Sequence, residues 1–344
     1  MVVVYILFVL GLLFLMKGAD WIVDSSSSIA KKLGISTLVI GLTVVAFGTS
    51  LPELMVAIFS SIKGAGSIVL GNVVGSNIAN ILLILGTTAI ITQIKIKTDT
   101  IWKQIPFALL ACFVVYVFSG GVLFGIPRLA FGYVEGFILL SLLGIFLYSL
   151  LQMSENEPVK PRSIVLDFGL FTSIPKMIWS SRYALLDLKS DITDVDWKTY
   201  AKLILGLVGI YFGGVWVVDG AVYVARQFGL SQFLISATII SIGTTLPEFI
   251  VCLFAALRNK VDLAVGNAIG SVIFNFCGVL GIAAIINPIT IPALFYVDVA
   301  IMFFAILLLF IFMFVGNKHA LKRKDGVVFV LLYILYLAFV IIRG

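Results

Sequence analysis

The chain contains 344 residues, of which 61% are hydrophobic and only 12% are charged. Soluble domains carry about a quarter charged residues, so this composition excludes an ordinary soluble protein and predicts an integral membrane protein. The formal net charge of +6 comes from basic residues spread over many polar loops. The charge therefore gives no reason to expect nucleic acid as a partner.

Ten apolar runs are long enough to cross a bilayer, whose hydrocarbon core takes about 20 residues of helix. The first run has no basic segment in front of it, so we interpret it as a retained helix and not as a signal peptide. Together the runs predict an all-α membrane protein with ten transmembrane helices. In chain order, the predicted spans are approximately residues 2–24, 37–60, 67–92, 105–125, 130–151, 202–225, 232–257, 263–287, 292–315 and 326–342.

Basic residues are distributed unevenly between the two sets of loops. If residue 1 lies outside the cell, the outer loops receive only Lys63, Arg128, Arg226 and Arg343. By the positive-inside rule, the loops rich in Lys and Arg face the cytoplasm and both termini lie outside. We expect the protein to lie in the cell membrane. The charged residues 152–200 then form a cytoplasmic connector between a first half (residues 1–151) and a second half (residues 201–344).

Residues that usually bind transition metals are scarce and scattered. Cys112, Cys252 and Cys277 fall inside predicted spans at spacings that match no metal site, so we expect them to be packing residues. The single histidine, His319, lies in a basic loop. No base and nucleophile accompany the intramembrane acids, and we expect neither a prosthetic group nor enzymatic activity.

The two halves of the chain repeat each other. Sliding the sequence by 195 residues aligns residues 21–80 with residues 216–275 without a gap, with 21 identities in 60 positions. Each half holds five predicted spans, and because five is odd, the second half must enter the membrane with the opposite sense. Such inverted-topology repeats are typical of secondary transporters. The matched words are GTSLPE (48–53) with GTTLPE (243–248), and GNVVGSNIAN (71–80) with GNAIGSVIFN (266–275).

Each repeated word places oxygen atoms on one side of a span. Residues three or four apart share a face of a helix. In addition, Pro52 and Pro247 each leave one main-chain carbonyl unpaired, because proline has no N–H to donate. The side chains concerned are Thr49, Ser50, Glu53, Ser76 and Asn80 in the first half, and Thr244, Thr245, Glu248, Ser271 and Asn275 in the second.

The two glutamates are the residues that most strongly indicate a function. A charged carboxylate at the bilayer centre costs about 2.5 to 3.5 kcal/mol on insertion scales. If the inverted halves bring Glu53 and Glu248 together, a divalent cation would neutralise both. Carboxylate, hydroxyl, amide and carbonyl oxygens are hard ligands that favour Ca2+, Na+ or Mg2+ over Zn2+. A flexible mixture of them suits Ca2+ better than Mg2+.

Other repeated residues have more ordinary interpretations. Glycines spaced four apart let helices pack closely in lipid, and we expect packing at four of them. They are Gly71, Gly75, Gly266 and Gly270.

Repeated asparagines and aspartates complete the two matched windows. Asn72 and Asn267 could either complete broken helix ends or take part in permeation, and the sequence leaves both interpretations open. Asp24 and Asp219 lie near the ends of predicted spans, where capping or interfacial solvation is expected. Three further acids do not repeat and receive no assignment: Asp20, Glu135 and Asp298.

With these words the chain resembles the cation/Ca2+ antiporter superfamily, and in particular prokaryotic members of the sodium/calcium exchanger family. Both words of that family are present, as TVVAFGTSLPE with GNVVGSNIAN and as TIISIGTTLPE with GNAIGSVIFN. The resemblance implies four cation sites between the second, third, seventh and eighth helices, and exchange of Ca2+ for Na+ by sliding of the first and sixth. As ligands it implies the ten side chains given above, with the carbonyls of Ala46 and Ser241.

Three positions depart from the family pattern. Asn275 stands where well-studied exchangers often have Asp, Thr245 replaces a commoner Ser, and Val272 corresponds to Asn77 of the first half. Since Asn keeps the shape of a protonated Asp, we expect Ca2+ binding to survive, whereas the coupling ion stays open.

Two alternative functions remain. The nearer is a Ca2+/H+ or K+-dependent cation antiporter. The more distant is a cation channel, which an inverted repeat with two alternating gates disfavours. We expect a monomer in the lipid bilayer that exports Ca2+ under an inward Na+ gradient.

Overall fold

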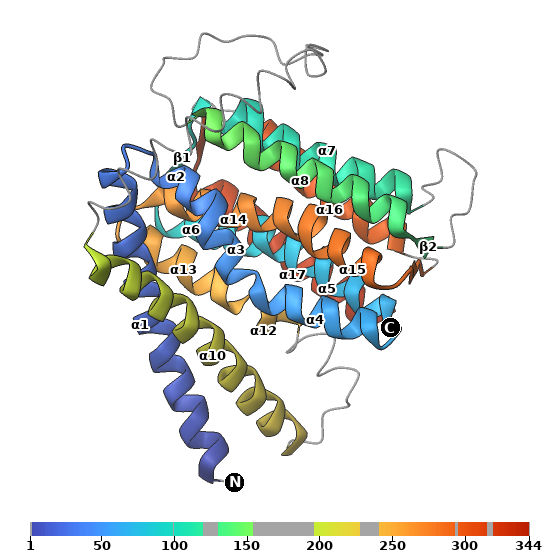
Figure 1. The fold of residues 1–344 in the computed structure, drawn as a ribbon, viewed down its shortest axis with the longest axis horizontal. Coiled ribbons are helices and arrows are strands. Elements are labelled where there is room, and N and C mark those ends of the chain that lie inside the picture. Colours follow the sequence, from blue (N-terminus) through green and yellow to red (C-terminus); the bar gives the residue numbers. More distant parts are fainter. Residues whose placement is uncertain are drawn as a thin grey trace.

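The computed structural model describes residues 2–98, 100–119, 130–153, 196–227, 241–292, 295–314 and 319–343. These residues are almost entirely helical (Figure 1), which confirms the all-α prediction. Among them, eight helices are long and apolar enough to cross a membrane. A ninth span results if the bent pair Thr37–Thr49 and Leu51–Ile62 counts as one. Of the expected span 232–257, the described part contains α12 (Ser241–Thr244) and α13 (Leu246–Leu257).

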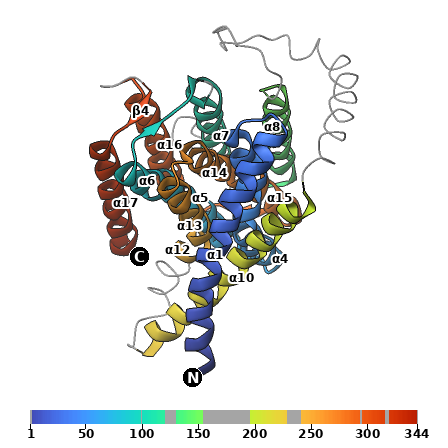
Figure 2. The same cartoon turned by 90° about the vertical axis from the view of Figure 1, so that its left-hand side faces the viewer.

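Two long helices form a pair of their own. α1 (Val2–Lys32) and α10 (Trp197–Gln227) lie side by side in both views (Figures 1 and 2). A Cβ added to Gly11 of α1 would lie 2.8 Å from the main-chain oxygen of Gly213, and one added to Gly18 would lie 2.8 Å from that of Gly206. The missing side chains therefore allow the two backbones to approach closely, as small residues do between membrane helices.

α1 is longer than predicted, since it runs to Lys32 instead of ending near residue 24. The prediction ended the span where a run of serines begins. In the structure, serine hydroxyls of this run donate hydrogen bonds to main-chain carbonyls four residues earlier, which keeps the polar side chains within the helix. The bonds are Ser25 to Trp21, Ser27 to Val23 at 2.7 Å and Ser28 to Asp24 at 2.9 Å.

The next span is broken in the middle. It consists of α2 (Thr37–Ile40), the π-helical segment η1 (Gly41–Val45), α3 (Ala46–Thr49) and α4 (Leu51–Ile62), with a bend of 45° before α4. Pro52 lies in the first turn of α4, where its missing N–H costs no helical hydrogen bond. α13 begins in the same way, with Pro247 in its first turn. Proline thus ends one helical segment and starts another at both repeated words.

Two continuous helices form the buried centre of the molecule. The first consists of α5 (Gly66–Ile78), η2 (Ala79–Ile84) and α6 (Leu85–Ile91), and the second of α14 (Val261–Ile273), η6 (Phe274–Val279) and α15 (Leu280–Ile286). Their apolar windows are 78% and 83% buried, against 17% to 39% for the other candidate spans. Both contain a π-helical segment at the same place, 195 residues apart.

The predicted close packing of glycines is confirmed for two of the four. A Cβ on Gly266 would lie 2.5 Å from the main-chain oxygen of Leu38, and one on Gly270 would lie 2.8 Å from that of Leu42. At Gly71, by contrast, nothing in the described part of the chain lies within 4 Å. The repeat would place residues 233–237 against Gly71, and these lie outside the described residues.

The outer helices complete the bundle. They are η3 (Thr100–Gln104) continuing into α7 (Ile105–Phe118), α8 (Tyr133–Met153), α16 (Phe295–Phe312) and α17 (Arg323–Arg343). The fourth span therefore begins before the predicted residue 105, and its helix ends at Phe118, with residues 120–129 outside the described part. α10 likewise begins at Trp197, within the range expected for the connector, of which residues 154–195 are not described.

Acidic residues stabilise the first turns of two outer helices. The carboxylate of Glu135, which had no assigned role, accepts the N–H of Gly132 at 3.0 Å before α8. Asp325 accepts the N–H of Lys322 at 2.8 Å before α17. Both satisfy main-chain donors that the helix start would otherwise leave unpaired.

Two short antiparallel strand pairs join the halves of the chain. β1 (Ile94–Lys95) pairs with β4 (Ala320–Leu321), and β2 (Ala130–Phe131) pairs with β3 (Ile289–Thr290). The helices beside these strands also pack against the opposite half, since α17 packs against α6 and α8 packs against α15. Each half therefore contributes its last helix to the surface of the other half.

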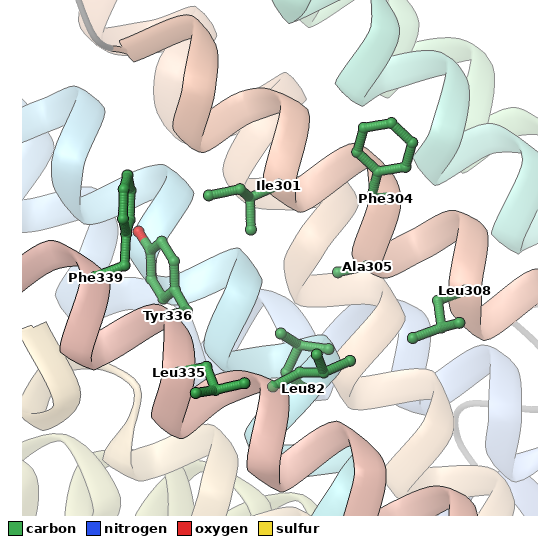
Figure 3. A pocket seen from close by; sticks show the side chains of 9 residues that line it. Leu82, Ile301, Phe304, Ala305, Leu308, Leu335, Tyr336 and Phe339 are labelled. Atoms are coloured by element: carbon green, nitrogen blue, oxygen red, sulfur yellow. The ribbon is translucent and has the colours of Figure 1, made fainter.

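A cavity of about 340 Å³ lies between α16 and α17 (Figure 3). Apolar side chains line it, among them Leu82, Leu308, Leu335 and Phe339. Leu335 and Phe339 are exposed, at 64% and 40%, so the cavity opens onto the apolar outer surface. Because no charged group lines it, this cavity is not a cation site.

Candidate functional site

The two breaks place a glutamate at the start of a helix in the interior. Glu53 lies in the first turn of α4 and Glu248 in the first turn of α13. Both side chains are 0% exposed. The positive end of a helix dipole favours a carboxylate at this position, which offsets part of the cost of burying the charge.

Each glutamate receives hydroxyl groups on one of its two oxygens. Ser50 Oγ donates to Glu248 Oε1 at 2.8 Å, and Ser271 Oγ lies 3.5 Å from the same atom. Ser76 Oγ donates to Glu53 Oε1 at 3.4 Å. Since Ser50 belongs to the first half and Glu248 to the second, the two repeated words meet at this point.

The remaining oxygen of each glutamate has no protein partner. Glu53 Oε2 and Glu248 Oε2 are buried without a hydrogen bond, as are both polar side-chain atoms of Asn80 and the Oδ1 of Asn275. A buried polar atom without a partner costs about 1 to 3 kcal/mol, and more if it is charged. Four of these five atoms are oxygens, one on each of four predicted ligands, and such unpaired oxygens are what a cation site requires, whereas Asn80 Nδ2 is a donor.

Asn80 and Asn275 occupy equivalent positions in the two π-helical segments. Each is the second residue of its segment, in η2 and η6 respectively. The wider turn is closed by hydrogen bonds from Leu85 N to the Asn80 carbonyl and from Leu280 N to the Asn275 carbonyl. π-turns inside α-helices frequently mark functional sites, and here they carry two predicted ligands.

Asn77 fixes the orientation of the Asn275 amide. Asn275 Nδ2 donates to Asn77 Oδ1 at 3.1 Å, while Asn77 Nδ2 donates to the main-chain oxygen of Val272 at 3.4 Å. The Oδ1 of Asn275 is consequently the atom left for a ligand. Val272, which stands where the repeat would place a second asparagine, therefore contacts Asn77 through its main-chain oxygen.

The first threonine of each repeated word contacts an asparagine of the opposite half. Thr49 Oγ1 donates to Asn267 Oδ1 at 3.1 Å, and Thr244 Oγ1 donates to Asn72 Oδ1 at 3.1 Å. The sequence left the roles of Asn72 and Asn267 open. The repeated GN dipeptide was the available signal, but it carried no information about a partner in the other half.

Two predicted ligands, Ala46 and Thr245, take part in contacts within a turn of their own helices. Thr49 Oγ1 lies 3.3 Å from the carbonyl oxygen of Ala46, and Thr245 Oγ1 donates to the carbonyl of Ile242 at 3.1 Å. Ser241 is the first residue of α12, and its side chain lies outside the described part. The described residues contain no group of three or more His, Cys, Asp or Glu side chains that could hold a metal ion. A cation held at the two glutamates would thus rely on hydroxyl and amide oxygens.

An ion-pair cluster lies outside this site. Arg258, directly after α13, pairs with Asp20 and Asp24 of α1. Lys17 also pairs with Asp20, at 3.5 Å. Asp24 is exposed, as expected for an interfacial residue, and it also has a partner 234 residues away in the chain, which the sequence did not reveal. Asp219, its counterpart in the second half, is exposed.

Comparison with known proteins identifies relatives over most of the chain. Residues 3–152 and 198–342 match the family described as "Sodium/calcium exchanger protein". The sodium/calcium exchanger MaX1 of Methanosarcina acetivorans is 32% identical over 346 residues, covering 97% of each chain. The inner membrane protein YrbG of Escherichia coli is 32% identical over 292 residues, covering 84% of this chain and 82% of that protein.

Solved structures give the same result. A structure of the sodium-calcium exchanger NCX_Mj, soaked with Na+ and Sr2+, superposes with a TM-score of 0.77 and 31% sequence identity. The match covers 98% of this chain and 99% of that chain. This multi-pass membrane protein is therefore a transporter and not an enzyme, and it belongs to the sodium/calcium exchanger family.

Proposed function

We propose that the chain is a secondary active antiporter that exchanges Ca2+ for Na+ by alternating access. The observation that carries this proposal is the pair of fully buried glutamates, each with one oxygen bonded to a hydroxyl and the other without a protein partner. Ca2+ balances two carboxylates with its own charge, and several Na+ ions can replace it on the same oxygens. Both ions are transported substrates, and no prosthetic group takes part.

The proposed ligands are those expected from the sequence. Their oxygens are hard and of mixed type, which suits Ca2+. In support, the atoms without partners belong to Glu53, Glu248, Asn80 and Asn275. The full set is Ala46 (carbonyl), Thr49, Ser50, Glu53, Ser76, Asn80, Ser241 (carbonyl), Thr244, Thr245, Glu248, Ser271 and Asn275.

For the architecture we propose ten spans in two inverted five-helix repeats, residues 1–151 and 201–344, joined by a connector (152–200). Reciprocal contacts support this arrangement: β1 pairs with β4 as β2 pairs with β3, and Thr49 contacts Asn267 as Thr244 contacts Asn72. The distribution of basic residues supports an outward position of both termini and a cytoplasmic connector. We propose a monomer in the cell membrane.

Charge accounts for the coupling of the two fluxes. An empty site holds two carboxylates in the protein interior, and moving them across a low-dielectric barrier is unfavourable. A site filled with Ca2+ or Na+ is closer to neutral. Only an occupied site can then switch between the two sides of the membrane. After one ion has been released on one side, the site must therefore bind another ion there before it can return. With an inward Na+ gradient, the expected direction is Ca2+ export.

The test is transport in proteoliposomes made from the purified chain. Vesicles loaded with Na+ and diluted into Na+-free buffer should accumulate labelled Ca2+, and vesicles with equal Na+ on both sides should not. A pH gradient and a K+ gradient are imposed separately as matched conditions. Accumulation driven only by the pH gradient would refute Na+ coupling and favour a Ca2+/H+ antiporter, and a requirement for K+ would identify a K+-dependent one. A steady current in symmetrical salt would indicate a channel.

A further inference from the structure

Asn72 and Asn267 each join both halves of the molecule within the buried interior. Asn72 Nδ2 donates to the main-chain oxygen of Glu53 at 3.5 Å, and its Oδ1 accepts from Thr244. Asn267 Nδ2 donates to the main-chain oxygen of Glu248 at 3.4 Å, and its Oδ1 accepts from Thr49. The two side chains are 9% and 0% exposed.

The orientation of both amides is determined by these partners. A main-chain carbonyl oxygen can only accept a hydrogen bond, so the NH2 group must face the glutamate backbone. Asn267 Nδ2 also faces Cys252 Sγ at 3.3 Å. In both asparagines the acceptor oxygen must then face the threonine hydroxyl of the other half.

This acceptor matters because a hydroxyl group has only one proton. Thr49 Oγ1 lies 3.0 Å from the Val45 carbonyl and 3.3 Å from the Ala46 carbonyl, both on its own helix, and 3.1 Å from Asn267 Oδ1. If the proton goes to Asn267, the two carbonyls keep their lone pairs, and those of Thr49 stay available to a cation. If the Thr49 proton goes to the Ala46 carbonyl instead, that proposed cation ligand is occupied by a hydrogen bond.

We propose that Asn72 and Asn267 are positioning residues for ion exchange. They accept the protons of Thr244 and Thr49, so that oxygen lone pairs and not hydroxyl hydrogens face the transported cation, and they do not bind the ion themselves. This role rests on the proposed function and deepens it. It also explains why the word GN is repeated next to each group of ligands.

The test measures ion affinity separately from maximal rate. In proteoliposomes, Asn267→Ala should raise the half-saturating Ca2+ and Na+ concentrations about three- to tenfold, as the loss of one oriented hydrogen bond implies, with a nearly unchanged maximal rate. Asn287→Ala is the matched control, because Asn287 donates to the main-chain oxygen of Ser61 at 3.1 Å and also joins the halves. It should leave both affinities unchanged.

A double-mutant cycle identifies the residue through which Asn267 acts. Thr49→Val removes the hydroxyl, so adding Asn267→Ala to it should change affinity no further. Additive effects, or a lower maximal rate with unchanged affinities, would overturn the proposal. If Asn267→Ala yields no folded protein, Asn72→Ala with Thr244→Val decides by the same criteria. Absence of Na+-driven exchange in the unaltered chain would instead refute the proposed function.

A second observation, independent of the first, concerns the ion pairs of α1. Arg258 ties the C-terminal end of α13 to Asp20 and Asp24. α1 is packed along α10, and the pair lies across both broken helices, with α1 against α2 and α13, and α10 against α3 and α12. Any sliding of the α1–α10 pair must therefore break the Arg258 ion pairs.

The repeat assigns a second pair to the other half. A shift of 195 residues relates Asp24 to Asp219 on α10, and Arg258 to Lys63 after α4. Both Asp219 and Lys63 are exposed, and within the described residues neither forms an ion pair. In an inverted repeat, this pair belongs to the opposite side of the membrane. Asp20, however, corresponds to the uncharged Val215.

We infer that the two ion pairs are alternating latches, given the proposed alternating access. Arg258 with Asp24 holds the α1–α10 pair in the arrangement described here, and Lys63 with Asp219 holds it after the slide. Because the first latch has a second carboxylate in Asp20, an unliganded transporter should favour the described arrangement.

Cysteine cross-linking tests the latches during transport. The variants are Lys63→Cys with Asp219→Cys, and Arg258→Cys with Asp24→Cys, each treated with a short thiol cross-linker. The native cysteines Cys112, Cys252 and Cys277 are buried.

Both pairs should cross-link under exchange conditions, and each cross-link should stop exchange until a reductant cleaves it. The inference fails if Lys63→Cys with Asp219→Cys forms no cross-link under any ion gradient while that variant transports normally. It also fails if the cross-linked protein still exchanges. Transport by the untreated variants checks the proposed function separately.

Discussion

Replacement of Gly266 by alanine tests the contact that holds the two halves around the site. A Cβ at this position would lie 2.5 Å from the main-chain oxygen of Leu38, 3.0 Å from the N of Leu42 and 3.1 Å from the Cα of Gly41. All three are backbone atoms, so no side-chain rotation relieves the clash. α14 and the segment α2–η1 must separate by about 0.9 Å to restore an ordinary contact of 3.4 Å.

The expected cost has two opposing parts. Overpacking of this kind costs about 1 to 3 kcal/mol, and alanine recovers about 0.5 to 1 kcal/mol of helix propensity relative to glycine. The adjacent hydrogen bond from Thr49 to Asn267, 3.1 Å long, would be stretched beyond the usual limit by the same separation. We therefore expect Gly266→Ala to lower both thermal stability and cation affinity.

Gly144→Ala is the matched control, because Gly144 lies on the exposed face of α8. Nothing in the described part of the chain lies within 4 Å of its Cβ position. The substitution should therefore be neutral or stabilising by up to about 1 kcal/mol. The assay is thermal unfolding of both variants in detergent at one scan rate, followed by Ca2+ exchange in proteoliposomes. Equal midpoints and equal affinities for the two variants would refute the packing argument.

Three further substitutions have distinct expected outcomes. Glu53→Gln or Glu248→Gln should reduce Na+-driven Ca2+ flux at least about 100-fold, because a Ca2+–carboxylate interaction is lost at low dielectric. The protein should stay folded. Normal flux in either variant would show that the replaced glutamate is not part of the site. Asn275→Asp adds a carboxylate beside Asn77 and should make Ca2+ efflux depend more steeply on Na+ concentration; an unchanged Na+ dependence would show that this position does not set the coupling. Ser61→Ala removes a buried hydrogen bond to the Ala283 carbonyl, 2.6 Å long, and should lower stability by about 0.5 to 1.5 kcal/mol without changing ion affinity, which equilibrium Ca2+ binding would check.

Local patterns in the sequence were sufficient for much of the fold. Apolar runs located the spans, and the repeated words located the breaks at Pro52 and Pro247, because hydropathy and proline geometry act over a few residues. The C-terminal end of α1 was missed, because Ser25, Ser27 and Ser28 bond to their own helix. A run of polar serines predicts the end of an apolar span, but hydroxyl groups that bond to carbonyls of their own helix destabilise it little.

Contacts between the halves were beyond the reach of these patterns. The bond from Thr49 to Asn267 and the ion pairs of Arg258 join residues more than 200 positions apart. The repeat predicts that such partners come in equivalent pairs, but it does not state which residues touch. The π-turns at Asn80 and Asn275 were also missed, because one extra residue in a helical turn leaves no mark in hydropathy.

The exchange of outer helices between the halves bears on how the protein is made. β4 pairs with β1 and α17 packs against α6, although β4 and α17 follow these elements by more than 200 residues in the chain. During synthesis the face of α6 must therefore stay in contact with lipid or with an insertion chaperone until α17 has been made. A truncation after residue 318 removes β4 and α17 and should expose this face of α6, and membrane proteases should then degrade the truncated protein faster than the full chain.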